Sequence, residues 1–343
     1  MTQYAFAPYG ERFEPEPGRL VLDVGMKTVP GVIDHHHPDA EPECAASLVV
    51  KYPGLVLDHL KPAGPDEANA ETVTFVTHRL PDFDALASIF LAQKLLETGR
   101  VDAIMDKIGA YTKLVDSASL PKTIDLSGTP YAILRALFAG AKKSEDEVNA
   151  DRVAEGLKFM RFLYARTAEG RDILENRALF AGVDRYERAI VKVERDYQEY
   201  LDDLIRARKI VLSLPTTDGR GRKVVDGLLV ANPRSFLLKE WAGRDRSEAP
   251  GGRGFGFLMT SFGPGRYILG VNPALGVNLR GLGTILNDRE HQRRAAAGRP
   301  PGLPWYEGNC PFFNYRIIDS PRDGTSLTRD DIVAAVLEFG RPI

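Results

Sequence analysis

The sequence is poor in cysteine and carries almost no net charge. Its two cysteines, Cys44 and Cys310, lie far apart and show no metal-ligand spacing, so we expect a reducing compartment and no disulfide framework. The formal net charge of −2 over 343 residues argues against a protein that coats long duplex nucleic acid by bulk attraction. No apolar run approaches the roughly 20 residues that cross a bilayer. The first residues also lack the basic start and apolar run of a signal peptide. We therefore expect a cytoplasmic protein without a membrane partner.

The length favours more than one domain, since single cores stop growing near about 250–300 residues. Apolar residues make up 43% of the chain and charged residues 27%, the balance of an ordinary globular protein. Strand-like and helix-like segments alternate in the first part of the chain. This order predicts an α/β fold with a mostly parallel sheet flanked by helices. We predict a metal-binding α/β domain over 1–140, a helical connection over 141–208 and a smaller α+β domain over 209–343.

Apolar patterning and helix breakers predict the individual elements. Residues 1–19 contain several prolines among polar residues and are expected to be irregular. Buried strands are expected at 20–24 and 72–77, and apolar helices at 44–52 and 86–96. The other expected elements are a helix over 108–115, a long helix over 186–208, a hairpin of 209–214 and 223–230, strands around 255–259, 266–271 and 315–318, and helices around 282–295 and 329–339.

Two short stretches hold four of the six histidines. They are Asp34-His35-His36-His37 and a His-x-x-x-Asp-x-Asp segment that begins at His78. Each follows an apolar, strand-like run, and open α/β sheets place their sites just past the carboxyl ends of strands. Imidazole nitrogens together with carboxylate oxygens suit manganese, iron(II), magnesium or zinc. The two stretches therefore predict a dinuclear metal centre that hydrolyses a phosphate ester or anhydride.

The second stretch supplies most of the expected ligands. His78, Asp82 and Asp84 leave a tight loop at intervals of four and two, and a loop can turn all three side chains inward. Three such ligands and one bridging carboxylate suffice for two cations roughly 3.5–4 Å apart. Asp23, at the end of its own strand, is the natural bridge.

The first stretch adds one ligand and two supporting residues. We expect His35 to bind metal, Asp34 to fix the tautomer of that histidine, and His36 to bind or protonate the substrate phosphate. Asp116, at the end of a helix, can complete the shell of the second ion, with Asp184 as the alternative. Two cations lower the pKa of a bound water from about 15.7 towards neutrality and so supply a hydroxide nucleophile.

These motifs together resemble the DHH phosphoesterases, which include family II inorganic pyrophosphatases, RecJ-type exonucleases and oligoribonucleases. The resemblance covers roughly the first 120 residues and includes Asp23-Val24-Gly25 before Asp-His-His. It implies two manganese ions and a two-domain architecture with substrate between the domains. It also implies a substrate-phosphate role for His36 and metal-ligand roles for Asp23, His35, His78, Asp82, Asp84 and Asp116. The order of the two motifs is reversed relative to the usual one, as if the sheet were permuted, which surface loops allow.

Basic residues in the last third of the chain are candidates for binding substrate. Arginine beside aromatic residues suits a phosphate held next to a stacked base, whereas the alternative interpretation is a solvated helix face. The substrate class that follows from the resemblance is a small nucleotide or a short oligonucleotide. The alternatives are a pyrophosphatase-like or sugar-phosphate hydrolase and a nucleotide sensor without turnover; a homodimer is compatible with either. The candidate residues are Arg280, Arg289, His291, Arg293, Arg294 and Arg322.

Overall fold

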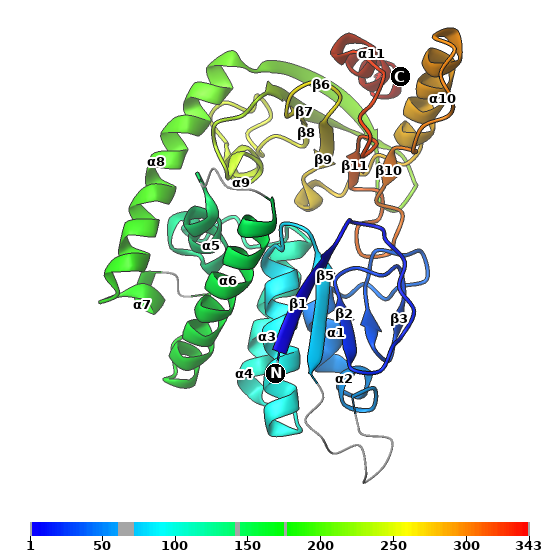
Figure 1. Ribbon diagram of the computed structural model, residues 1–343. Coiled ribbons are helices and arrows are strands. Elements are labelled where there is room, and N and C mark those ends of the chain that lie inside the picture. Colours follow the sequence, from blue (N-terminus) through cyan, green and yellow to red (C-terminus); the bar gives the residue numbers. More distant parts are fainter. Residues whose placement is uncertain (1, 61–71, 141–144, 175–176, 342–343) are drawn as a thin grey trace. The chain divides into compact units, whose positions relative to one another are not determined.

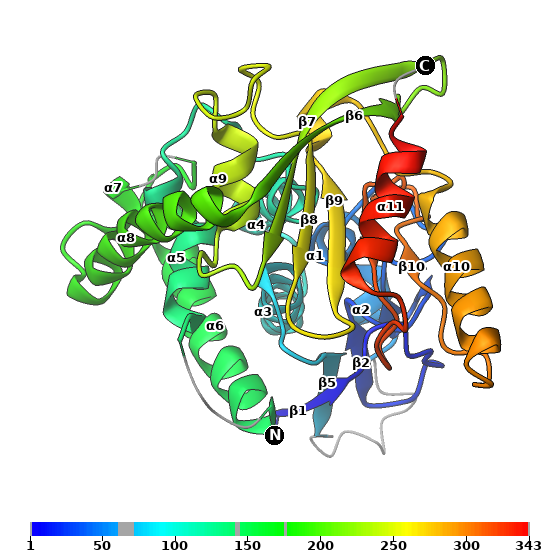
Figure 2. The same cartoon turned by 90° about the horizontal axis from the view of Figure 1, so that it is seen from above.

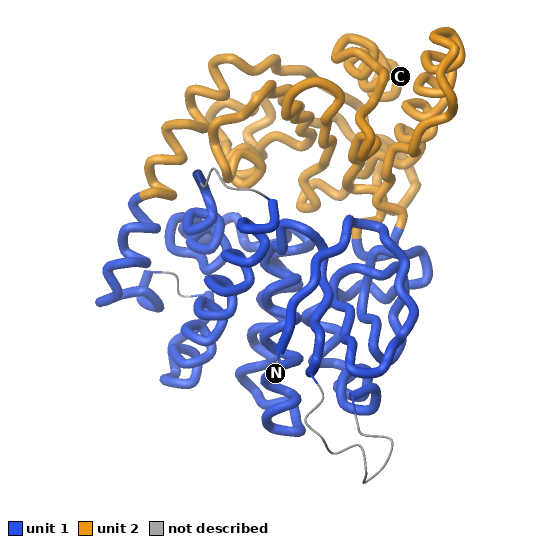
Figure 3. The backbone as a smooth tube through the Cα atoms, viewed as in Figure 1, with its two compact units in different colours: residues 1–191, 310–312 blue, residues 192–309, 313–343 orange. Residues whose placement is uncertain are grey.

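The computed structural model describes residues 2–60, 72–140, 145–174 and 177–341. The chain divides into two compact units (Figure 3). Unit 1 comprises Met1–Val191 together with Cys310–Phe312, and unit 2 comprises Lys192–Asn309 with Phe313–Ile343. Both contain sheets and helices, so the α/β class is confirmed. In the part of the chain that is described, no helix combines the length and apolarity that crossing a membrane requires.

Unit 1 is built on a five-stranded mixed sheet in the order β1-β5-β2-β4-β3 (Figure 1). Three of the pairings are parallel: β1 with β5, β5 with β2, and β2 with β4. The fourth pairing, between β4 and β3, is antiparallel. Continuous apolar character explains why β2 and β4 lie in the core, since a strand covered on both faces needs no polar alternation. The strands are β1 (Thr2–Ala7), β2 (Arg19–Leu22), β3 (Thr28–Val29), β4 (Val32–Ile33) and β5 (Val73–His78).

The expectation that residues 1–19 are irregular was wrong for Thr2–Ala7, which forms β1. β1 pairs with β5 in parallel along its whole length, so that Ala7 lies opposite His78. The prolines that suggested irregularity begin only at Pro8, and Thr2–Ala7 carries no residue that a strand excludes. The strand expected over 20–24 ends at Leu22, because Asp23 adopts a positive φ of 61°.

Helices α1, α3 and α4 pack against one another, and α6 packs against α3. Asp82 caps α3 by accepting hydrogen bonds from the first backbone N–H groups, and Gly99 ends it in the left-handed conformation. The helices of this region are α1 (Ala45–Lys51), α2 (Gly54–Leu57), α3 (Phe83–Thr98), α4 (Ala103–Asp116), η2 (Leu126–Gly128), α5 (Pro130–Phe138), α6 (Glu145–Ala168), α7 (Arg177–Phe180) and α8 (Asp184–Arg206). The unit boundary falls within α8.

Unit 2 contains a six-stranded mixed sheet in the order β10-β11-β9-β8-β7-β6. The predicted hairpin is confirmed, because β6 (Arg208–Pro215) and β7 (Arg222–Ala231) pair antiparallel. β7 and β8 are parallel, and the other pairings are antiparallel. The remaining elements are α9 (Leu238–Arg244), β8 (Phe257–Ser261), β9 (Tyr267–Val271), η3 (Pro273–Leu275), α10 (Leu282–Ala296), β10 (Tyr306–Glu307), β11 (Ile317–Asp319) and α11 (Arg329–Phe339).

Helices cover both faces of this second sheet (Figure 2). Val225 and Leu229 of β7 pack in the core that includes α10 and α11. Leu228 and Val230 of the same strand pack with residues of α8 and α9. This alternation is the period of two that a strand imposes on its side chains. The domain bounds 1–140, 141–208 and 209–343 stay a prediction.

Candidate metal centre

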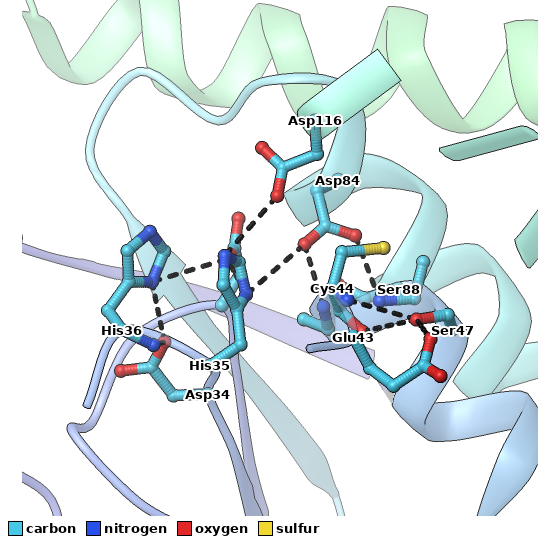
Figure 4. Close-up of polar contacts among 12 residues, drawn as sticks. Asp34, His35, His36, Glu43, Cys44, Ser47, Asp84, Ser88 and Asp116 are labelled. Carbon is cyan, nitrogen blue, oxygen red and sulfur yellow. Dashed lines mark hydrogen bonds and ion pairs between the residues drawn. The ribbon is translucent and has the colours of Figure 1, made fainter. Parts of the chain in front are cut away.

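Carboxylate and imidazole side chains gather in unit 1 where β2, β4 and β5 end. Asp23 directly follows β2, His35 comes two residues after β4, and His78 is the last residue of β5. Asp84 lies in the first turn of α3, and Asp116 is the last residue of α4. The parallel ladders bring the carboxyl ends of these strands to one edge, and for that reason residues so distant in sequence meet there. Figure 4 shows His35, Asp84 and Asp116 of this set.

The ligand-type atoms form three groups in which all atoms lie within 4.8 Å of one another. Asp23 belongs to two of the groups and His35 to two, so the groups join into one cluster. All six predicted metal residues are members, whereas Asp184, the first residue of α8, is in none of the groups found among the described residues. The groups are Asp23, Asp34, His35 and His36; Asp23, His78 and Asp82; and His35, Asp84 and Asp116.

His35 lies at the middle of this cluster and is fully buried. Its Nε2 is 3.2 Å from Oδ2 of Asp116, and its Nδ1 is 3.5 Å from Oδ1 of Asp23. Burial opposes protonation of the ring, but the carboxylates of Asp116 and Asp84 outweigh it and raise the pKa of His35 to about 9. The ring also contacts Phe312 edge to face, with centroids 4.8 Å apart. Each ring nitrogen therefore faces a carboxylate oxygen.

Asp23 is placed as a bridge between the imidazoles. Its Oδ2 lies 3.2 Å from Nε2 of His78, while its Oδ1 faces His35. Burial, followed by the negative charges of Asp84 and Asp82, raises the pKa of Asp23 well above its ordinary value. The left-handed backbone at Asp23 turns the chain out of β2 at this point, a conformation that aspartate adopts more readily than most residues. A divalent cation would offset the repulsion between these carboxylates.

His78 has a defined tautomer. Its Nδ1 lies 2.9 Å from the carbonyl oxygen of Arg79, and a carbonyl can only accept, so Nδ1 carries the proton. Its Nε2 lies 3.2 Å from Oδ2 of Asp23 and 3.7 Å from Oδ1 of Asp82. Burial opposes protonation of this ring, but the hydrogen bond and charge of Asp82 outweigh it and raise the pKa of His78. An imidazole that binds a cation through one nitrogen and is fixed by a hydrogen bond from the other is the usual arrangement of a histidine ligand, and here Nε2 is the nitrogen left for a cation.

Asp84 links the cluster to a helix. Its two carboxylate oxygens accept hydrogen bonds from the backbone N–H groups of Ala45 and Ala46, at 2.8 and 2.9 Å, in the first turn of α1 (Figure 4). Burial and the nearby charge of Asp116 raise the pKa of Asp84 to about 6. The helix N-terminus favours the ionised form, which is the form a cation requires.

Asp34 is hydrogen-bonded to His36. Its Oδ1 accepts from Nδ1 of His36 at 2.7 Å and from the backbone N–H of His36 at 3.1 Å. An aspartate side chain reaches the backbone two residues on in an Asx-turn, which explains this contact, and the role of Asp34 in fixing the tautomer of His35 stays a prediction. His36 is the more accessible of the two histidines, with its side chain 17% exposed.

Two buried carboxylate oxygens test whether this cluster suits a cation. Oδ1 of Asp23 and Oδ2 of Asp116 each lie near a ring nitrogen of His35, but neither makes a hydrogen bond to the described part of the chain. Buried polar atoms normally have a partner, and buried charges are paired or bind metal. The mixed nitrogen and oxygen donors are the set that manganese, iron(II), magnesium or zinc accepts. The residues therefore fit a divalent cation.

The candidate substrate residues of the last third all lie in unit 2, and two of them are already engaged there. Arg294 forms ion pairs with Glu290 at 2.9 Å and Asp323 at 3.2 Å, and Arg289 pairs with Glu338. Arg280 lies over the ring of Tyr315, 4.4 Å from its centroid. The other three are exposed: His291 and Arg293 on α10, and Arg322 in the turn after β11.

Three contributors to the cluster were not anticipated from the sequence. Tyr9 stacks on His78, Phe312 contacts His35, and Asn149 of α6 binds the backbone of Leu80. None carries a local pattern that would mark it. Comparison with protein-family models and with curated proteins found no match.

Proposed function

We propose that this protein is a metal-dependent phosphohydrolase of the DHH phosphoesterase type, with two divalent cations, manganese preferred, and a mostly parallel sheet behind the metal centre. The observation that carries the proposal is the cluster of three ligand groups joined through Asp23 and His35. Two ions held on either side of a shared carboxylate would supply an activated water and neutralise the phosphoryl oxygens. The motif resemblance supports the family, and the cytoplasm stays the expected location.

Asp23 and His78 would hold one side of the cluster, with Asp82 beside them. His35, Asp84 and Asp116 would hold the other side, since their ligand atoms form a separate group that shares no member with the first. The peptide N–H groups of α1 orient Asp84 and favour its ionised form, against the effect of burial. This division supports a dinuclear rather than a single-ion site.

His36 is suited to contact the substrate phosphate. Burial would raise the pKa of Asp34, but the hydrogen bond and charge of His36 outweigh this and lower it, so the carboxylate stays ionised at neutral pH. The ionised carboxylate keeps the proton of His36 on Nδ1. Nε2 is then the nitrogen that faces the substrate: as N–H it would donate to a phosphoryl oxygen or to the leaving group, and without its proton it would accept one.

The substrate class we propose is a small nucleotide or a short oligonucleotide. Support comes from the guanidinium of Arg280 over the ring of Tyr315 and from exposed His291 and Arg293 in unit 2, side chains suited to bases and phosphates. These residues stay predictions for substrate contact, as does Arg322.

Hydrolysis of a mixed panel with manganese supplied tests the proposal. The panel contains pyrophosphate, a 3′,5′-bisphosphonucleotide, a cyclic dinucleotide and a linear dinucleotide. We expect turnover of one class, its loss in Asp82→Ala and His35→Ala, and its retention in the matched control Asp184→Ala. If purified protein binds manganese and a nucleotide tightly but turns over no member of the panel, the hydrolase proposal fails and a nucleotide sensor remains.

A further inference from the structure

Tyr9 is held beside the metal-facing histidine by the sheet itself. It follows β1 by two residues, and β1 is paired with β5 so that Ala7 lies opposite His78. The backbone N–H of Arg79 continues this pairing by donating to the carbonyl of Ala7 at 2.8 Å. The phenol ring stacks on the imidazole of His78 with centroids 4.1 Å apart and an interplanar angle of 23°. The position of Tyr9 is therefore set by strand register.

The hydroxyl of Tyr9 occupies the nitrogen that a cation would need. Its oxygen lies 3.1 Å from Nε2 of His78. Since Nδ1 of His78 donates to the carbonyl of Arg79, Nε2 is the nitrogen through which this ring can bind a cation. The same nitrogen faces Asp23 and Asp82. A cation bound at Nε2 would take the position that now contacts the hydroxyl of Tyr9, so cation binding separates the hydroxyl from this nitrogen.

Tyr9 is also accessible to a ligand. It is 44% exposed, whereas His35, His78, Asp23 and Asp84 are buried. The ring of His36, the proposed phosphate contact, approaches Tyr9 edge-on with centroids 6.2 Å apart. A phenol O–H displaced from Nε2 stays within reach of whatever lies between these two side chains.

We propose that Tyr9 is a catalytic residue whose O–H donates a hydrogen bond to a non-bridging phosphoryl oxygen of the substrate once the cations are bound. The inference rests on the proposed phosphohydrolase function. The inference gives the hydroxyl of Tyr9 two partners in turn. In the metal-free protein the hydroxyl is hydrogen-bonded to Nε2 of His78, and in the metal-bound protein it binds the phosphoryl group opposite His36. Metal loading therefore both activates the site and completes its anion-binding face.

Tyr9→Phe tests this role, because it keeps the stacked ring and removes only the hydroxyl. Calorimetric titration of Mn²⁺, and then of inorganic phosphate into the Mn²⁺-loaded protein, separates the two states. We expect Mn²⁺ affinity that is unchanged or tighter and phosphate affinity about 10-fold weaker, the size of one lost hydrogen bond to a charged group. The matched control is Tyr52→Phe, whose hydroxyl donates to Glu41 at 2.6 Å, and we expect it to change neither affinity.

The outcomes separate this inference from the function on which it rests. Wild-type protein that binds no Mn²⁺ would overturn both. Wild-type protein that binds Mn²⁺ and phosphate with the same affinities as Tyr9→Phe overturns the role of Tyr9 alone. Weaker phosphate binding in Tyr9→Phe supports that role even if the wild-type protein hydrolyses no member of the substrate panel, in which case only the hydrolase proposal fails.

Discussion

Nε2 of His35 lies 3.2 Å from Oδ2 of Asp116, although one residue follows a strand and the other ends a helix. The contact brings the carboxyl end of α4 to the edge where β2, β4 and β5 end. It also favours Asp116 over Asp184 as the carboxylate that completes the second ion's shell, because Asp184 is in none of the ligand groups found among the described residues.

Replacing Asp116 should remove one ion and leave the other. We expect Asp116→Asn to lower the manganese content from two ions per chain to one and to weaken binding of the lost ion at least about 100-fold. Metal analysis after dialysis, with Asp184→Asn as the matched control, measures this. The assignment is wrong if Asp184→Asn loses the ion and Asp116→Asn retains it.

Metal removal should destabilise the wild-type protein but not a variant with fewer buried charges. At about 100 times its Kd, a cation adds about 2.7 kcal/mol to the free energy of unfolding. Asp23→Asn removes a buried, repelled carboxylate, so we expect the metal-free variant to be more stable than metal-free wild type by on the order of 1 kcal/mol. Manganese should then add little to it.

Thermal unfolding with manganese and with a chelator measures both effects. The exposed Asp39→Asn serves as a charge-matched control that should behave like wild type. An identical Tm for wild type with chelator and with manganese would contradict the expected stabilisation.

Asn149 should act on the metal centre through the backbone. Leu80 has a positive φ of 55°, which costs a residue with a side chain about 1 kcal/mol. The side chain of the buried Asn149 accepts a hydrogen bond from the backbone N–H of Leu80 at 2.5 Å, and Arg152 donates to the backbone carbonyl of Leu80 at 2.9 Å. Helix α6 therefore holds the turn between His78 and Asp82. We expect Asn149→Ala to lower stability by about 1–3 kcal/mol and manganese affinity about 10-fold.

A rescue experiment distinguishes this positioning role from general damage to α6. Glycine adopts a positive φ without strain, so adding Leu80→Gly to Asn149→Ala should restore much of the manganese affinity. Lys158→Ala, on an exposed part of the same helix, should leave it unchanged. A double variant that recovers stability without recovering affinity would refute the positioning role.

Glu290 should make the stability of unit 2 sensitive to acid. It is buried in α10 and accepts hydrogen bonds from the N–H and hydroxyl of Ser326, from Thr325 and from Arg294. Burial would raise its pKa, but these bonds outweigh it and lower the pKa to about 2 from an ordinary 4.5. The stabilisation is therefore fully present above about pH 4.5 and is lost as the pH falls towards 2.

Across this interval the effect is on the order of 3 kcal/mol at most. Urea unfolding at pH 6, 4 and 3 should show a shallower loss in Glu290→Gln, which is less stable at pH 6 but has no charge there to titrate. Glu248→Gln, which removes a surface ion pair with Lys209, is the matched control and should follow wild type. Parallel pH profiles for wild type and Glu290→Gln would count against this account.

Much of the architecture could be predicted from local pattern. The hairpin β6–β7, the long helix α8 and helices α10 and α11 have strong periodicity or clear turn residues, and all are present. The six predicted metal residues meet because polar residues that follow apolar strands come to the same edge of a parallel arrangement. Predicting this meeting requires only the positions where strands end, and these positions can be recognised in the sequence.

The unpredicted parts depend on tertiary pairing. β3 and β4 have two residues each, too few to show a period. β1 was hidden by the prolines that follow it, and with it the position of Tyr9 beside His78. Phe312 reaches His35 from a distant part of the chain, and no local pattern encodes such a contact. The hydrogen bond between Asp34 and His36 depends on a backbone turn that composition does not reveal.

The assignment of Cys310–Phe312 to unit 1 also bears on synthesis at the ribosome. The long first segment of unit 1 ends at Val191, yet the aromatic ring that covers His35 is made roughly 120 residues later. At about 5–20 residues per second, the nascent chain waits on the order of 10 s for it. During that interval the imidazole of His35 lacks its Phe312 neighbour, so the proposed cations would meet this ring before the last segment of unit 1 has been synthesised.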